Sequence, residues 1–78
     1  MDNRKFQMIA NGYVCVTIDP EMICRRSGSF LKNRIRSTEE RKVILDNLLK
    51  WCKNAKVGDY HICDEFTVIV VERKKKNN

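Results

Sequence analysis

The sequence lacks the long apolar segment that a membrane protein needs. None of its apolar runs approaches the ~20 residues of a membrane-spanning helix. The N-terminal residues include Asp2, Arg4 and Lys5, and they lack the apolar core of a signal peptide. We therefore expect a cytoplasmic protein that does not bind a membrane.

Motifs for catalysis and for nucleotide binding are also missing. Residues 26–29 have neither the glycine spacing nor the Lys-Ser/Thr ending of a phosphate-binding loop. The single histidine, His61, has no legible cysteine partner for nucleophilic catalysis, and we interpret it as an ordinary strand residue rather than a general base. We therefore expect that the protein is not an enzyme and has no small-molecule substrate.

Paired metal-binding cysteines are missing as well, because no Cys-x-x-Cys motif occurs among the four cysteines. Cys15 and Cys52 fall at positions that the apolar pattern predicts to be buried, and we expect reduced core thiols. The alternative is a structural zinc site made by Cys24, His61 and Cys63, which the missing paired spacing disfavours. The sequence thus predicts no metal and no other cofactor.

Positive charge, by contrast, is abundant. The chain has 16 Lys and Arg residues against 10 Asp and Glu residues, which gives a net charge of +6. This charge favours nucleic acid or an acidic protein surface as the partner. A hydrophobic content of 42% supports one folded domain over residues 1–78, with residues 73–78 as a disordered basic tail.

The strongest structural signal is a long helix over residues 37–55. Ser37 and Glu40 fit a capping box at its start, and Gly58 is the expected stop. Trp51 at this spacing is expected in the core rather than as a stacking platform. Apolar residues recur at intervals of three and four positions and define the buried face: Ile44, Leu45, Leu48, Trp51, Cys52 and Ala55.

A hairpin is predicted before this helix, where Asn11-Gly12 separates two alternating apolar runs. A two-residue loop would place the apolar sets of the two strands on opposite faces of the sheet. We therefore predict a three-residue loop, residues 10–12, which pairs Met8 with Val14 and gathers both sets on one face. These residues are expected to form the core with the long helix.

A second hairpin is predicted after the helix. It joins a strand at residues 60–63 to a strand at residues 66–71 through Asp64 and Glu65. The second of these strands is almost entirely β-branched and apolar, which is typical of a strand covered on both faces.

The segment between the first hairpin and the helix is strongly basic, with no acid between Glu21 and Glu39. It begins with one helical turn at residues 19–22, which Asp19 is expected to cap. The remainder is either a loop or a loop followed by an edge strand over residues 30–35. We call it the basic connector.

The basic connector contains the candidate binding residues. Arg and Lys side chains neutralise phosphates, an aromatic ring can stack on a base, and neutral donors add phosphate contacts. The alternative, equally supported, is a solvated loop whose apolar residues tuck into the core. The candidate set is Arg25, Arg26, Phe30, Lys32, Arg34 and Arg36, with Lys74, Lys75 and Lys76 of the tail.

These elements predict an α+β fold: a small antiparallel sheet of four to five strands in the order ββ-connector-α-ββ, with one long helix packed on one face. A single helix leaves the other sheet face uncovered. We therefore expect a homodimer through that face.

One local resemblance follows from Val57-Gly58-Asp59-Tyr60-His61-Ile62 and the apolar strand at residues 67–71. These residues resemble the closing strands of RelE/ParE-type toxins, in which a Gly-Asp-Tyr-Arg strand leads into an apolar strand. The resemblance covers about a fifth of the chain and implies a ribonuclease toxin. His61 stands where that family often has Arg, and the family's Gly-His-Arg-Arg segment and two-helix N-terminal half have no counterpart in the sequence.

Taken together, these patterns favour a small non-enzymatic regulatory or inhibitory protein that acts on nucleic-acid machinery. Its size and composition are similar to those of many phage or mobile-element regulators. The alternatives are a sequence-independent nucleic-acid-binding protein that uses the basic connector, and a RelE/ParE-like ribonuclease toxin.

Overall fold

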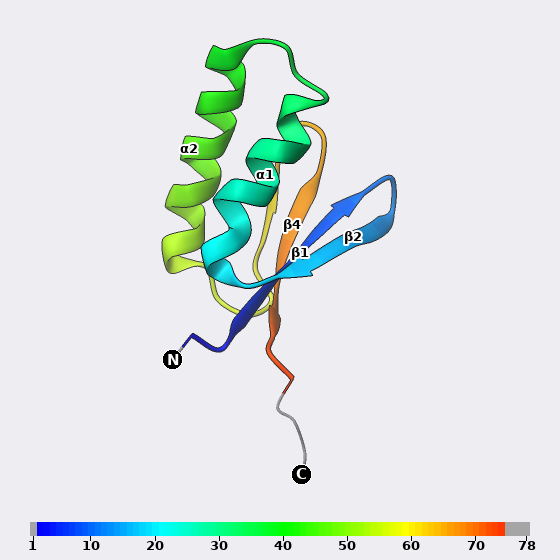
Figure 1. Ribbon diagram of the computed structural model, residues 1–78. Helices are drawn as coiled ribbons and strands as arrows, with labels where there is room; N and C mark the ends of the chain where they lie inside the picture. The colour runs from blue at the N-terminus through cyan, green and yellow to red at the C-terminus, as the bar shows by residue number, and fades with distance from the viewer. Residues whose placement is uncertain (1, 75–78) are drawn as a thin grey trace.

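The computed structural model describes residues 2–74, which form an α+β fold with both helices on one face of an antiparallel sheet (Figure 1). The strands are arranged in the order β2-β1-β4-β3. The predicted fold class, the two hairpins and the long helix are confirmed. A shorter helix, α1, was not predicted. The elements in chain order are β1 (Arg4–Ala10), β2 (Tyr13–Ile18), the 3-10 helix η1 (Pro20–Met22), α1 (Ile23–Lys32), α2 (Thr38–Asn54), β3 (Tyr60–Ile62) and β4 (Thr67–Glu72).

The long helix α2 begins where the capping residue predicts. The Ser37 hydroxyl accepts a hydrogen bond from the Glu40 amide at 3.2 Å, which satisfies one free N–H of the first turn. Leu48 and Cys52 are buried against the sheet, and Trp51 is half-buried. The predicted stop is wrong, because the helix ends at Asn54 and Gly58 belongs to the turn that follows.

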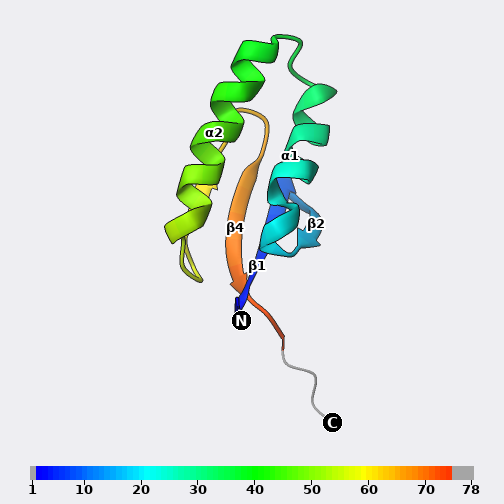
Figure 2. The same cartoon turned by 60° about the vertical axis from the view of Figure 1, so that its left-hand side comes forward.

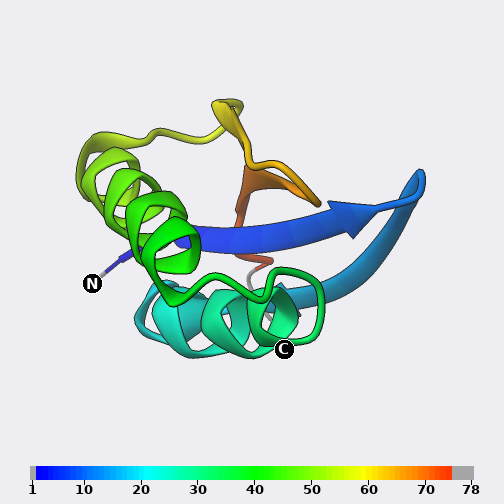
Figure 3. The same cartoon turned by 90° about the horizontal axis from the view of Figure 1, so that it is seen from above.

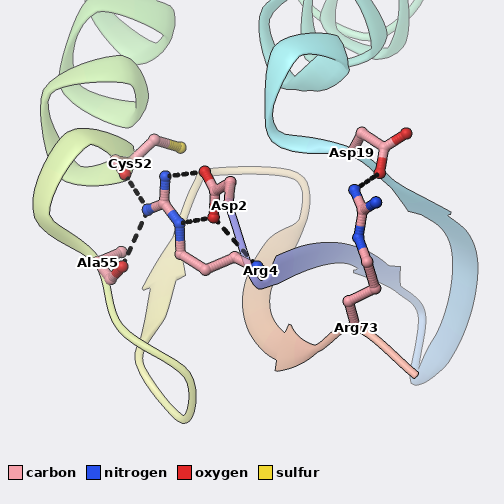
Figure 4. Close-up of polar contacts among 6 residues, drawn as sticks. All are labelled: Asp2, Arg4, Asp19, Cys52, Ala55 and Arg73. Atoms are coloured by element: carbon pink, nitrogen blue, oxygen red, sulfur yellow. Dashed lines mark hydrogen bonds and ion pairs between the residues drawn. The ribbon is translucent and has the colours of Figure 1, made fainter. Parts of the chain in front are cut away.

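Arg4 of β1 satisfies the end of α2, whose C-cap is Ala55 as the predicted range implies. Its Nη1 donates to the carbonyl oxygens of Cys52 at 2.5 Å and Ala55 at 2.9 Å, and it thereby satisfies C-terminal carbonyls that no intrahelical donor reaches (Figure 4). Asp2 holds the other side of the guanidinium through two contacts of 2.8 Å. This ion pair lowers the pKa of Asp2 to about 2, chiefly through the hydrogen bonds from Arg4. The start of β1 is thus tied to the end of α2.

The first hairpin uses the loop that we rejected. Asn11 and Gly12 have φ angles of 54° and 81°, and Ala10 pairs directly with Tyr13, so the loop has two residues. The register then shifts between Met8 and Ile9. A β-bulge at Cys15 causes this shift, since Ile9 pairs with Val14 whereas Met8 pairs with Val16. The bulge, rather than the loop, brings Val16 and Ile18 onto the same face as Phe6 and Met8.

This bulge places two side chains differently from the prediction. Val14 pairs with Ile9, and both lie on the face away from the helices, because neighbouring positions on a strand face opposite ways. Val14 is therefore 52% exposed rather than part of the core. Cys15 is exposed as well, which contradicts its predicted burial, whereas Cys52 is buried as predicted. All four cysteines are free thiols.

The basic connector is mostly helix, and the prediction of a loop or an edge strand is wrong. Ile23, Ser27 and Leu31 recur every four residues and are buried along one side of α1. Gly28 lies on the flank that faces α2, where an added Cβ would be 3.9 Å from Leu45 Cδ1. Of the small residues at positions 27–29, Ser27 is fully buried, and the flank at Gly28 has room for a methyl group.

The helical turn predicted at residues 19–22 is present as η1, but Asp19 does not cap it. The Asp19 carboxylate instead contacts Lys5 Nζ at 2.8 Å. It also contacts Arg73 Nη2 at 2.6 Å (Figure 4). The hydrogen bond from Lys5 is the main reason that the pKa of Asp19 lies below its usual value. Asp19 thereby joins η1 to the ends of two central strands.

The core lies between the helices and one face of the sheet (Figure 2). Phe6, Met8, Val68 and Val70 face α1 and α2, with Leu31 and Leu48 fully buried above them. Within the described residues only this face of β4 is covered, and the other face is the one that the predicted homodimer would cover. No helix among residues 2–74 has the length and apolarity to span a membrane.

The opposite sheet face is open and largely uncharged. The strand registers align Ile62, Thr67, Ile9 and Val14 in one row across all four strands. Tyr60, Ile69, Gln7 and Thr17 form the next row. Tyr60 and Ile62 are 64% and 70% exposed. We call these two rows the open face.

Candidate functional site

Helix α1 presents the cationic side chains of the basic connector to solvent. Arg25, Ser29 and Lys32 follow one another at intervals of four and three residues and point outward, opposite the buried side of the helix. Arg26 and Asn33 lie beside them on the flank toward the β1–β2 hairpin. Arg34 and Arg36 follow the helix and are also exposed. Folding as a helix therefore gathers charges that a loop would have spread apart.

No acid neutralises this basic set within the described part of the chain. The ion pairs among residues 2–74 join Asp2 to Arg4, and Asp19 to Lys5 and Arg73. Figure 4 shows the pairs made by Arg4 and Arg73. Both acids thus compensate cations that hold the fold together. Arg25, Arg26, Lys32 and Arg36 remain unpaired by any carboxylate in residues 2–74, and their field extends into solvent.

Phe30 is not a free stacking surface. Its ring contacts Phe66 edge-on, with 4.9 Å between centroids and an angle of 62° between planes. The Arg34 guanidinium lies over the Phe30 ring at 3.6 Å, and Nη1 is 3.5 Å from the Phe30 carbonyl oxygen, to which it donates. The Arg34 guanidinium therefore covers part of the half-buried Phe30 ring, and Arg34 is the exposed member of this pair.

A hollow of about 300 Å³ lies between α1 and the β1–β2 hairpin. Arg26, Asn33 and Arg34 line it from the helix side, together with Ser29 and Phe30. Met8, Cys15 and Val16 line it from the hairpin side. The hollow thus combines an apolar wall, neutral hydrogen-bonding groups and two guanidinium groups.

A second shallow hollow of about 320 Å³ continues along α1 and is lined by Met22, Arg25, Arg26 and Ser29. It shares Arg26 and Ser29 with the first hollow, so the two form one path beside the helix. We call this path the α1 groove. An extended, negatively charged chain matches its shape and charge.

The hairpin side of the α1 groove was not predicted. Met8 is a buried core residue as expected and Val16 packs against the core, but both also line the groove. Cys15 was expected to be buried and is exposed. Arg26, Phe30 and Asn33 recur at intervals of four and three residues, which is typical of one flank of a helix. The low helix propensity of the small residues at positions 27–29 argued against a helix there. The opposing wall depends on the bulge, which the sequence pattern did not reveal.

The predicted tail residues are only partly described. Arg73 was expected to be disordered, but it pairs with Asp19, and its amide donates to the Asn3 carbonyl at 3.0 Å. Lys74 is exposed beyond the end of β4. Lys75 and Lys76 lie outside the described residues.

His61 and Cys63 occupy a different part of the molecule, between α2 and β3. His61 stacks on Trp51, with 5.2 Å between ring centroids, and Trp51 also contacts Phe6 edge-on at 6.0 Å. Burial raises the pKa of the Cys63 thiol to about 11. Within residues 2–74, no group of three His, Cys, Asp or Glu side chains is arranged to hold a metal ion.

Comparison with known proteins returns no match among protein-family models, curated proteins or solved structures. The resemblance of residues 57–71 to RelE/ParE-type toxins therefore assigns no family to this chain.

Proposed function

We propose that this protein is a small non-enzymatic regulator that acts on nucleic-acid machinery by binding nucleic acid through the α1 groove. The observation that supports this proposal is the set of exposed cations on α1 that no acid of residues 2–74 neutralises. Phosphate backbones release counterions when such side chains bind them, which gives affinity without sequence readout. The neutral donors Ser29 and Asn33 supply additional contacts to phosphate.

The test compares two triple variants that remove the same charge from different helices. Arg25→Gln, Arg26→Gln and Lys32→Gln together remove three cations from α1. The control, Lys42→Gln, Lys50→Gln and Lys53→Gln, removes three exposed cations from α2. Binding of a fluorescent oligonucleotide is followed by anisotropy over a range of salt concentrations, and circular dichroism checks that both variants fold.

We expect the α1 variant to lose most of its affinity and the α2 variant to lose little. The slope of log K against log salt should become shallower by about 0.7–0.9 for each phosphate contact removed. Equal effects of the two variants would assign the binding to net charge alone. Failure of the unmodified protein to bind any oligonucleotide would overturn the proposal.

A protein partner is the second candidate, and the open face favours it. Its two rows expose apolar side chains across four strands, and the exposed Ile62 and Tyr60 lie on the edge strand β3. Large exposed apolar surfaces of this kind bind other protein surfaces. A second copy of the chain is the partner that we expect there, and an acidic protein surface is the alternative ligand for the α1 groove. The ribonuclease activity implied by the RelE/ParE resemblance remains a further alternative that RNA cleavage assays address.

A further inference from the structure

We propose that the α1 groove selects single-stranded nucleic acid, and that one unpaired base stacks on the Arg34 guanidinium inside the hollow beside the hairpin. This inference rests on the proposed function and specifies which form of nucleic acid the protein binds. Three independent features of the groove lead to it: a layered stack, a recessed shape and a line of cations.

The layered stack is formed by Phe66, Phe30 and Arg34. Phe66 supports the edge of Phe30, and Phe30 supports the guanidinium plane at 3.6 Å. The hydrogen bond to the Phe30 carbonyl further restricts the guanidinium. Arg34 is an exposed residue, and it lines the hollow together with Phe30. Bases stack on arginine planes as they do on aromatic rings, and a plane that is already fixed loses little entropy on binding.

The recessed shape favours an unpaired base over a duplex. Met8 and Val16 of the hairpin bound the hollow opposite α1. A base that enters it and stacks on Arg34 must have one face that is not already stacked on a neighbouring base. Bases in a duplex are stacked on both faces and paired along their edges. A helix that reads duplex DNA must also protrude into the major groove, which is about 12 Å wide. Figure 3 shows that α1 instead has α2 on one side and the projecting β1–β2 hairpin on the other.

The cations give the strand its path on either side of the stacked base. Arg26 lines both hollows, and Arg25 and Lys32 follow the outward side of α1. Asn33 and Ser29 line the hollow with groups that can hydrogen-bond the edge of any base. These features together match a sequence-tolerant site for a few nucleotides of a single strand.

Two cysteines allow a direct footprint of this site without any substitution. Cys15 lines the hollow, whereas Cys24 lies four residues before Gly28 and therefore on the α2 flank of α1. Both thiols are exposed, and Cys52 and Cys63 are buried. The rates at which a thiol reagent modifies Cys15 and Cys24, resolved by peptide mass analysis, therefore report on the two flanks separately.

The experiment measures these rates with no nucleic acid, with saturating oligothymidine and with a duplex of the same length. We expect oligothymidine to suppress modification of Cys15 in proportion to the bound fraction and to leave Cys24 largely unchanged. The duplex should bind more weakly at equal salt and should not protect Cys15.

A conservative variant tests the stacked plane itself. Arg34→Lys keeps the charge but removes the planar group, so it should weaken oligothymidine binding by roughly tenfold to a hundredfold, the range for one stacked base. Arg41→Lys is the matched control, because Arg41 lies on α2, does not line the α1 groove and has no aromatic ring beneath it in the described structure. It should change the affinity little.

The possible failures are distinguishable. If single strands and duplex bind with equal affinity and neither protects Cys15, this inference is overturned while the proposed function stands. Equal effects of Arg34→Lys and Arg41→Lys would overturn the stacked base in the same way. If neither nucleic acid binds, the proposed function fails and this inference fails with it.

Discussion

Leu48 is the residue through which α2 packs most completely, since its side chain is 0% exposed. Replacing it with alanine removes buried methyl groups and leaves a cavity between α2 and the sheet. We expect Leu48→Ala to lower the free energy of unfolding by about 2–5 kcal/mol in a denaturant titration. Val43→Ala is the control on the same helix, because Val43 is 59% exposed and its loss should cost less than ~0.5 kcal/mol. Similar values for both variants would contradict this packing.

The buried thiols Cys52 and Cys63 predict a loss of stability at alkaline pH. Burial raises the pKa of each from 9.0 to about 11, so between these values the folded protein holds protons that the unfolded chain releases. Their contribution to stability is therefore complete below pH ~9 and is lost as the pH rises toward ~11. The free energy of unfolding, measured by denaturant titration across this interval, should fall.

The matched variants for this measurement are two double substitutions. Cys52→Ala with Cys63→Ala should flatten the dependence on pH between ~9 and ~11, although it lowers stability at neutral pH. Cys15→Ala with Cys24→Ala should keep the full dependence, because both thiols are exposed in the folded protein. An unchanged slope in the first double variant would assign the alkaline loss to other groups.

At the scale of single elements, α1 makes the clearest prediction. Gly28 has helical geometry and room for a methyl group, since the nearest atom to an added Cβ lies 3.9 Å away. Gly28→Ala should therefore raise the free energy of unfolding by about 0.4–1 kcal/mol. Gly12→Ala should lower it, because Gly12 has a φ of 81° in the hairpin loop. A loss of stability on Gly28→Ala would contradict the helix.

The two helices differ in how much of their structure local sequence determines. Helix α2 has a capping residue, a complete apolar face and acids in its first turn, so its prediction needed no tertiary information. Helix α1 has no side-chain cap and contains Ser27, Gly28 and Ser29 in its middle. These residues have low helix propensity, and only packing against the sheet and α2 compensates for it.

At the scale of the whole molecule, the cations of α1 and the two rows of the open face lie on different sides. The helix side carries the cations of α1, and the open face carries two rows with no charged residue. A two-fold homodimer through the open face would leave both α1 grooves exposed, one on each outer side. Self-association and nucleic-acid binding are therefore compatible.

We predict that the unmodified protein shows a sedimentation coefficient that rises with concentration. Ile62→Lys should abolish this rise, because Ile62 is 70% exposed and begins the first row of the open face. Val43→Lys places the same charge on an exposed apolar position of α2 and should leave association unchanged. A monomer at every concentration tested would leave the open face to a different protein partner.

The sequence by itself determined the class of fold. Three local patterns each produced the expected element. They are the alternation on both sides of Asn11-Gly12, the apolar periodicity of α2 with its capping residue, and the β-branched run of β4. The net charge of +6 likewise follows from composition alone. Such features depend on neighbours in the chain and can be read without knowledge of the packing.

Tertiary structure decided the hairpin register and the conformation of the basic connector. The helices bury one face of the hairpin, and this burial stabilises the register that places Met8 and Val16 on that face. That register requires the bulge at Cys15, which is favourable only for this reason. Helix α1 forms because Ile23 and Leu31 are buried against the sheet and the second helix. The α1 groove lies between these two elements. It could therefore not be predicted, because residues 26–34 and residues 8–16 meet only in the folded molecule.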